Sequence, residues 1–284
     1  MPRVAIVTDS AADLPPELVA RHGITVVPLF VRFGSEEFKA GVNLSVDQFW
    51  ARMTAPDAPF PTTAAAAPGT FAEAYRRCLD DGAEAVVCIS VGSHLSATIK
   101  SAMLGAQDVG GREVHVIDST QASMGVGLLV VLAAEMAESG ASGTEIADAI
   151  RARTGDVFLY VALDTLEYLR KGGRISAAQA AIGTMLSIKP IITVRGGVVE
   201  TVDRIRTRSK ARERVIELIA AERSERRTIL HTGSAGDAAA FGAQLAPRLP
   251  GAPTPDSLAS APSGPSVGPH VGPNCVGAVG LRVR

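Results

Sequence analysis

Residues 4–10 read VAIVTDS, four apolar residues followed by three small polar ones. A short apolar run rich in valine and isoleucine is typical of a strand that is buried on both faces of a sheet. Similar runs end in polar residues at 85–90 and at 114–119, and amphipathic stretches separate the three runs. This alternation predicts a parallel sheet that is covered by helices on both faces.

The pattern changes after about Gly155. Residues 191–202 contain two β-rich runs on either side of an Arg-Gly-Gly turn, which predicts a β-hairpin. We therefore expect an α/β protein of two domains. The first is a parallel-sheet α/β/α domain over residues 1–154, and the second is an α+β domain over residues 155–284.

Some segments predict local structure only. The β-rich run 24–31 is expected to form one strand, and residues 177–186 are expected to form a helix. The proline-rich stretch 56–68 is predicted to be a loop, and the stretch 247–269, rich in Pro, Ser, Gly and Ala, is expected to be the least ordered part of the chain.

The composition of the 284 residues, with 46% hydrophobic and 20% charged residues, is that of an ordinary globular protein. A net charge of −1 and an aromatic content of 4% favour neither nucleic acid nor an anionic membrane surface as a partner. The longest apolar stretch, residues 126–134, is far shorter than the roughly 20 residues that cross a bilayer. Together with the absence of a signal-peptide pattern, this predicts a cytoplasmic protein without an integral membrane segment.

The three cysteines, Cys78, Cys88 and Cys275, form no C-x-x-C pair. This odd, scattered set argues against a disulfide framework and a structural zinc site, and it favours a reducing compartment. The sequence also lacks a P-loop, a nucleophile elbow and an H-E-x-x-H motif. We therefore expect no metal and no nucleotide cofactor.

Polar residues follow the predicted strands of the first domain, at 8–10, 90–98 and 118–119. Open parallel sheets bind ligands beyond the carboxyl ends of their strands. Ser96 and Thr98 also open a predicted helix, whose free N–H groups and dipole favour an anion such as a carboxylate or a phosphate. Residues of these types at a helix start are most often plain helix caps, but three such sites at one sheet edge favour a shared site, so both interpretations stay open at this point.

Other polar residues lie beside predicted loops and turns. Thr62 and Thr63 lie in the loop before a predicted helix, and His270 lies in a predicted tight turn. Arg174 follows a Gly-Gly turn, where its cation is free to face a ligand or a partner. The plain structural interpretation is that the threonines belong to an exposed linker and that the histidine is a surface residue.

Motifs along nearly the whole chain, taken in order, resemble the DegV family. The stretch DTLEYLRKGGRI at 164–175 is the most specific match. The other matching stretches are 8–15, 23–29, 95–102, 116–125, 189–191, 206–207 and 270–273.

The resemblance implies that a long-chain fatty acid, such as palmitate, stearate or oleate, is bound between two α/β domains. It implies that Thr63 and Ser96 hold the carboxylate while the tail is buried. The residues implied to lie near the head group, or on a docking surface for a kinase, are Thr62, Arg174, Arg206 and His270.

The resemblance further implies a carrier and not a free-standing enzyme. In bacteria that have the matching dihydroxyacetone-kinase-like fatty acid kinase, the bound acid is phosphorylated to an acyl phosphate for phospholipid synthesis. The chain departs from the family pattern in four places, one of which is the Pro/Ser-rich stretch before His270. The usual T-S-Q-P-S loop is here Thr63 followed by four alanines, Ala97 replaces a glycine, and Asn274-Cys275 replaces a common Gly-Ala pair.

Two other functions differ from the carrier in class. A serine hydrolase would use Ser96 or Ser93 as nucleophile with His94 and Asp118 nearby, but a histidine two residues from Ser96 is poorly placed as its base. A lipid-sensing regulatory module would bind the same ligand and differ only in its protein partner.

Overall fold

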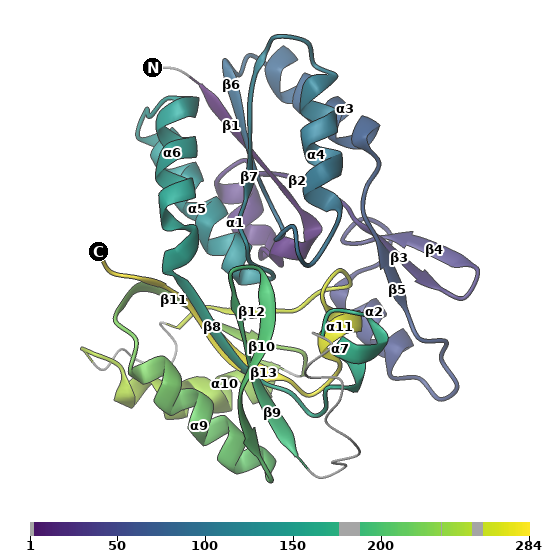
Figure 1. The fold of residues 1–284 in the computed structure, drawn as a ribbon, viewed down its shortest axis with the longest axis vertical. Helices are drawn as coiled ribbons and strands as arrows, with labels where there is room; N and C mark the ends of the chain where they lie inside the picture. The colour runs from purple at the N-terminus through teal and green to yellow at the C-terminus, as the bar shows by residue number, and fades with distance from the viewer. Residues whose placement is uncertain (1–2, 176–187, 234, 252–257) are drawn as a thin grey trace.

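The computed structural model describes residues 3–175, 188–233, 235–251 and 258–284 (Figure 1). Within these ranges the chain forms an N-terminal parallel-sheet α/β domain, a separate C-terminal domain of sheet and helices, and a small third sheet at the side of the molecule. The helix expected over 177–186 lies outside the described residues.

The first sheet has four parallel strands in the order β2-β1-β6-β7. They are β1 (Val4–Asp9), β2 (Thr25–Val27), β6 (Ala85–Ser90) and β7 (Glu113–Asp118). Two helices pack on each face, α3 (Pro68–Asp80) and α4 (Thr98–Gln107) on one, α5 (Met124–Glu138) and α6 (Gly143–Arg153) on the other. A short 3-10 turn, η1 (Ser10–Ala12), and the helix α1 (Pro16–Arg21) connect β1 to β2. This arrangement confirms the predicted parallel sheet with both faces covered.

The second sheet has the order β10-β9-β8-β13-β11-β12, and only the β11–β12 pair is parallel. Its strands are β8 (Val157–Ala162), β9 (Lys189–Arg195), β10 (Val198–Ile205), β11 (Ser224–His231), β12 (Ser260–Pro262) and β13 (Val276–Arg282). One face is covered by α9 (Arg208–Ala220) and α10 (Ala235–Leu245). Shorter elements are η2 (Thr154–Asp156), α7 (Glu167–Lys171), η3 (Ala246–Arg248) and α11 (Gly268–Val271).

Helix α5 joins the two domains. It is apolar around its whole circumference, and it packs against strands of both large sheets within one hydrophobic core. A helix of that composition is stable only when every side is buried. No helix in the described ranges combines the length and apolar character needed to cross a membrane.

The third sheet was not expected from the sequence. It has the order β4-β3-β5, with β3 (Phe30–Phe33), β4 (Glu36–Lys39), β5 (Thr62–Ala64) and the helix α2 (Val46–Met53) beside it. The run 24–31 is therefore divided between two sheets, because Pro28 lacks an N–H group and interrupts the ladder. The stretch 56–68, predicted as a loop, contains strand β5, and the described part of 247–269 contains strand β12 and the beginning of α11.

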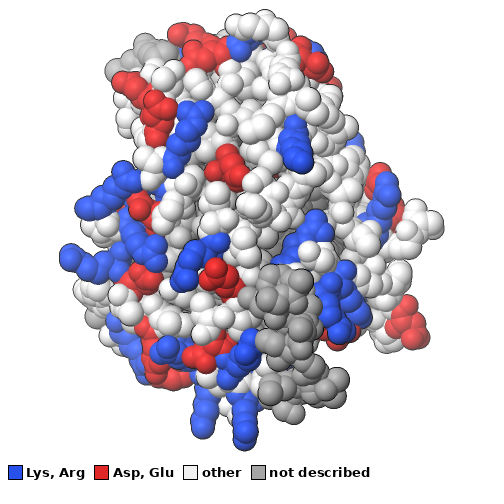
Figure 2. Space-filling model, viewed as in Figure 1, with Lys and Arg blue, Asp and Glu red and all other residues white. Residues whose placement is uncertain are grey.

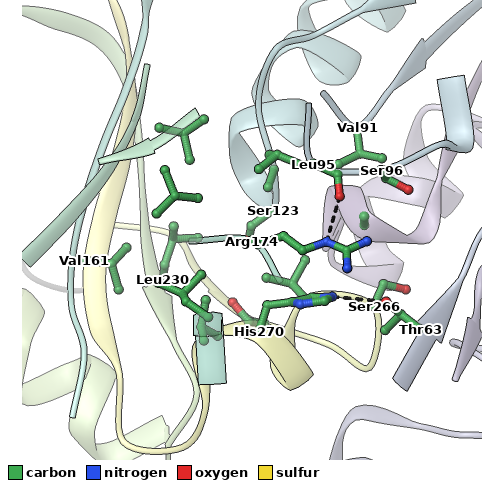
Figure 3. A pocket seen from close by; sticks show the side chains of 18 of the residues that line it. Thr63, Val91, Leu95, Ser96, Ser123, Val161, Arg174, Leu230, Ser266 and His270 are labelled. Carbon is green, nitrogen blue, oxygen red and sulfur yellow. Dashed lines mark hydrogen bonds between the residues drawn. The ribbon is translucent and has the colours of Figure 1, made fainter. Parts of the chain in front are cut away.

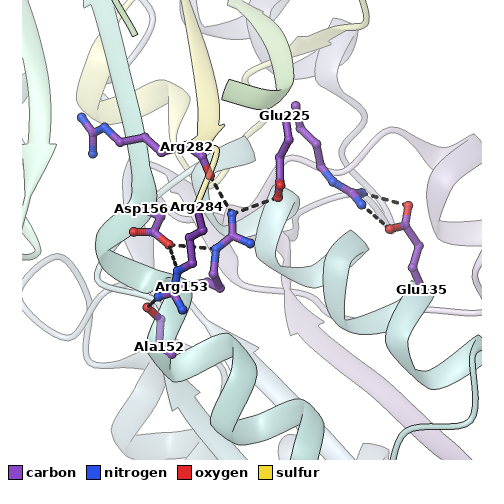
Figure 4. Close-up of polar contacts among 8 residues, drawn as sticks. Glu135, Ala152, Arg153, Asp156, Glu225, Arg282 and Arg284 are labelled. Atoms are coloured by element: carbon purple, nitrogen blue, oxygen red, sulfur yellow. Dashed lines mark hydrogen bonds and ion pairs between the residues drawn. The ribbon is translucent and has the colours of Figure 1, made fainter. Parts of the chain in front are cut away.

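Ion pairs add a second connection between the domains (Figure 4). Arg226 on β11 donates to both carboxylate oxygens of Glu135 on α5, and Arg153 of α6 donates to Glu225 of β11. Figure 2 shows acidic and basic side chains interspersed over the C-terminal domain. These pairs are only partly buried, and ion pairs near the surface contribute about 1 kcal/mol or less each, so the apolar packing of α5 is the main link between the domains.

Candidate fatty-acid site

A cavity of about 280 Å³ lies between the two domains. The N-terminal domain contributes the segments that follow β1 and β6 and the start of α5, and the C-terminal domain contributes β8, β9, β10 and β11. Open α/β sheets bind ligands at this edge. The volume is close to the lower end of the ~300–1,000 Å³ that is typical of small-molecule sites.

One wall of the cavity is aliphatic. Residues two positions apart on a strand point to the same face, so β8 and β9 each contribute two side chains to this wall. The wall consists of Leu159, Val161, Ile192, Val194, Val199 and Leu230. Such a surface accommodates a hydrocarbon chain and offers it no hydrogen-bonding group.

Polar side chains gather on the other side of the cavity. Figure 3 shows Thr63, Ser96, Arg174, Ser266 and His270 there, opposite Val161 and Leu230. The cavity is therefore divided into an apolar part and a polar part, which suits an amphipathic ligand.

Thr63 and His270 form the first contact of the polar part. Thr63 is on β5 and His270 is on α11, and their Oγ1 and Nε2 atoms are 3.0 Å apart. Burial, and secondarily the charge of Arg174, lowers the pKa of His270 to about 4, so the ring is neutral at pH 7. Its Nδ1 is buried without a partner among the described residues. With its proton on Nε2, the ring donates to Thr63 and leaves the threonine hydroxyl proton free for a ligand.

Ser96 lies at the beginning of α4, as its position in the sequence predicts. Its Oγ accepts the N–H of Thr98 at 3.2 Å and is 2.8 Å from the Oγ1 of Thr98, which is fully buried. The backbone N–H of Thr98 donates to Ser96, and with the Thr98 hydroxyl donating as well, the Ser96 hydroxyl proton is available to an anion in the cavity. The N-terminus of the ten-residue helix favours the same negative charge.

Arg174 connects the two domains across the site. Its Nε donates to the carbonyl of Leu95 at 2.9 Å, and its Nη1 donates to the carbonyl of Gly172 at 2.6 Å. These bonds hold the guanidinium between Ser96 and Thr63 (Figure 3). A guanidinium has five N–H groups, so donors remain for a carboxylate.

Thr62 and Arg206 do not line the cavity. Both are exposed, and Arg206 directly follows β10. Thr62 and Thr63 are neighbours on β5, so their side chains point to opposite faces of the strand. Of the predicted site residues, Thr63, Ser96, Arg174 and His270 are thus brought together.

Several lining residues were not anticipated from the sequence. They are Ser123, His231, Thr232, Ser263 and Ser266. Ser123 belongs to a motif that matches the family, which is a signal that could have identified it. Ser263 and Ser266 lie in the stretch 247–269, which was expected to be the least ordered part of the chain and whose composition gives no indication of a site.

The geometry does not assemble a hydrolase. Ser93 and His94 are exposed, and the Asp118 carboxylate accepts backbone N–H groups from Ser93 and Thr120. In the described part of the chain, no hydrogen bond joins His94 to a serine hydroxyl or to Asp118. The same residues contain no cluster of three or more His, Cys, Asp or Glu that could hold a metal ion.

A sequence profile of the family described as "Uncharacterised protein, DegV family" matches residues 3–282. This chain belongs to the DegV family. The identity between this chain and a DegV domain-containing protein of Streptomyces coelicolor is 37% over 280 residues, which is 97% of each protein.

Two solved DegV structures are similar over the whole fold. A DegV family protein from Thermus thermophilus, described as binding fatty acid, has a TM-score of 0.88 and 34% identity over 99% of this chain and 100% of that chain. DegV of Bacillus subtilis, described as a fatty acid binding protein, has a TM-score of 0.87 and 28% identity over 100% of both chains. The DegV resemblance of the sequence motifs and the predicted fold class are confirmed.

Proposed function

We propose that this DegV protein is a cytoplasmic carrier that binds a long-chain fatty acid, such as palmitate, stearate or oleate. The observation that supports it most is the division of the cavity into a polar part and an aliphatic part. The fatty-acid binding described for the Thermus and Bacillus relatives points to the same ligand class.

The carboxylate is placed among Thr63, Ser96 and Arg174. The two hydroxyls donate to its oxygens, and the guanidinium keeps it ionised inside a cavity that would otherwise favour the neutral acid. The neutral His270 orients Thr63 and adds no second cation. Charge-assisted hydrogen bonds of this kind fix the head group at one end of the cavity.

The tail supplies most of the affinity. Each buried methylene contributes about 0.8 kcal/mol, so a chain of about 15 could provide on the order of 12 kcal/mol before the cost of association is subtracted. The polar groups therefore need only to orient the acid and to distinguish it from other lipids.

Titration of delipidated protein with oleate and with oleyl alcohol tests this assignment. The two ligands share the hydrocarbon chain and differ in the head group, so we expect oleate to bind at least about 10-fold more tightly because its bonds are charge-assisted. Equal affinities would show that the polar residues do not recognise a carboxylate, and absence of binding for both would contradict the carrier function itself.

We extend the proposal to a partner, a dihydroxyacetone-kinase-like fatty acid kinase that converts the bound acid to an acyl phosphate for phospholipid synthesis. The family motifs support this step, and the exposed Arg206, outside the cavity, is placed where a docking protein can reach it. A lipid-sensing regulatory protein would use the same cavity with a different partner, and capture of the partner from the native organism would distinguish the two.

Substitution of Arg206 by alanine separates docking from binding. We expect the Arg206→Ala variant to bind oleate with unchanged affinity and to support acyl phosphate formation by the kinase at a rate reduced about 10-fold or more, since an interfacial arginine is a common hot spot. Production of acyl phosphate is measured with the kinase, ATP and oleate-loaded carrier. An unchanged rate would remove Arg206 from the docking surface.

A further inference from the structure

Ser266 is a buried polar residue to which the proposed head-group contacts assign no role. It lies on the segment between β12 and α11, it is 6% exposed, and it lines the cavity on the polar side with Thr63 and His270 (Figure 3). Among the described residues its hydroxyl has one hydrogen-bond partner, the Oγ of Ser10 at 2.8 Å.

Ser10 is the partner of Ser266 in this hydrogen bond, in which either serine could donate. The Ser10 Oγ also accepts the backbone N–H of Leu29 at 2.9 Å. An anion in the cavity favours the direction in which Ser10 donates to Ser266, because Ser266 then keeps its own proton for the anion.

The proton of the Ser266 hydroxyl is then free, and Ser266 lines the cavity. The three groups form a chain in which Leu29 N–H donates to Ser10, Ser10 donates to Ser266, and Ser266 donates to a ligand. Successive hydrogen bonds polarise one another, so the last hydroxyl is a better donor to an anion than an isolated serine. Unlike Ser266, the cavity-lining Ala64 and Ala65 next to Thr63 offer no hydroxyl.

The segment that carries Ser266 is fixed by both domains. Asp13 accepts the N–H of Gly264 at 2.9 Å, the Trp50 indole N–H donates to the carbonyl of Ser263 at 3.0 Å, and the Ser263 N–H donates to the carbonyl of His231 at 2.8 Å. A hydroxyl that is already positioned loses little freedom when the ligand binds, which strengthens its contribution to affinity.

We propose that Ser266 is a further carboxylate-binding residue, a hydroxyl donor from the C-terminal domain that selects fatty acids over uncharged lipids of the same chain length. This inference rests on the proposed fatty-acid function. It gives the head group donors from both domains, with Thr63 and Ser96 from the first and Ser266 with Arg174 from the second.

The test compares oleate and oleyl alcohol binding to delipidated wild-type protein and to the variants Ser266→Ala and Ser266→Cys. Cysteine keeps the approximate size of serine and is a weak donor. Both variants are expected to bind oleate roughly 10-fold more weakly, because a hydrogen bond to a charged group is lost, and to bind oleyl alcohol as the wild type does. Ser93→Ala, which alters an exposed serine outside the cavity, is the matched control and should change neither affinity.

The outcomes distinguish the two proposals. If wild-type protein prefers oleate to the alcohol and both Ser266 variants keep that preference in full, Ser266 does not bind the carboxylate and the fatty-acid function stands. If the variants lose affinity equally for both ligands, the serine has only a structural role and the inference is wrong. If wild-type protein binds neither ligand, the proposed function fails together with the inference.

Discussion

Replacement of Arg174 by methionine is expected to lower the affinity for oleate about 100-fold, because truncation of one partner of a desolvated charge pair costs about 2–5 kcal/mol. Methionine keeps much of the length of the side chain and removes the charge and every N–H donor. The carboxylate would then be held by hydroxyls alone in a cavity with an aliphatic wall. Isothermal titration with oleate and with oleyl alcohol measures the effect, and only the acid should be affected.

Arg170→Met is the matched control. Arg170 is an exposed cation in the same short helix region, four residues before Arg174, and it does not line the cavity. Its substitution should leave both affinities within about twofold, since exposed charges far from the ligand are screened. If Arg174→Met and Arg170→Met lower the affinity for oleate to the same extent, long-range attraction accounts for the result, and Arg174 does not contact the carboxylate directly.

The second large effect concerns stability at acidic pH and involves His270. Its pKa is lowered to about 4 in the folded protein, against about 6.5 in an unfolded chain. Between pH 4 and pH 6.5 the unfolded chain carries a proton on His270 that the folded protein lacks. The stability that comes with the neutral, buried histidine is therefore complete above pH 6.5, and it is lost as the pH falls toward 4. The loss amounts to at most about 3 kcal/mol in the free energy of unfolding.

Asp13 acts in the opposite direction in the same range of pH. Burial raises its pKa to about 7 although Ser123 and the Gly264 N–H donate to it, so its proton stabilises the folded chain most at low pH. The dependence of the wild-type free energy of unfolding on pH contains both contributions. Comparison with the variant His270→Gln isolates the contribution of the histidine. Glutamine can still donate to Thr63 and does not titrate.

Urea unfolding of delipidated protein at pH 4.5, 5.5 and 7 checks the prediction. The stability of His270→Gln relative to the wild type should improve steadily as the pH is lowered. The Arg174→Met variant, which keeps His270, should lose less stability at acidic pH than the wild type, because the charge of Arg174 is the second cause of the lowered pKa of His270. A constant difference between His270→Gln and the wild type over this range would mean that His270 titrates normally.

The parallel sheet could be predicted because its strands carry their own signal. Val86, Val87 and Ile89 of β6 are fully buried, and an uninterrupted apolar run is what burial on both faces requires. The aliphatic wall of the cavity is less evident. Its residues come from four strands, and their side chains resemble ordinary core residues until the second domain is placed against the first.

The third sheet and Ser266 could not be predicted for a related reason. Strand β5 has three residues, and it is held by pairing with β3, about thirty residues earlier in the chain. Ser266 lies in a stretch rich in proline, serine and glycine, and it gains a partner only because Ser10 is brought to it across 256 positions. Contacts of this separation leave no periodicity in the local sequence.

Mass spectrometry of lipid extracted from the protein after purification from a bacterial host tests the carrier function most directly. The proposed function predicts a long-chain fatty acid in an amount close to one molecule per chain, and a reduced amount in Arg174→Met. Protein that carries no fatty acid, and that acquires none when it is incubated with oleate, would contradict it.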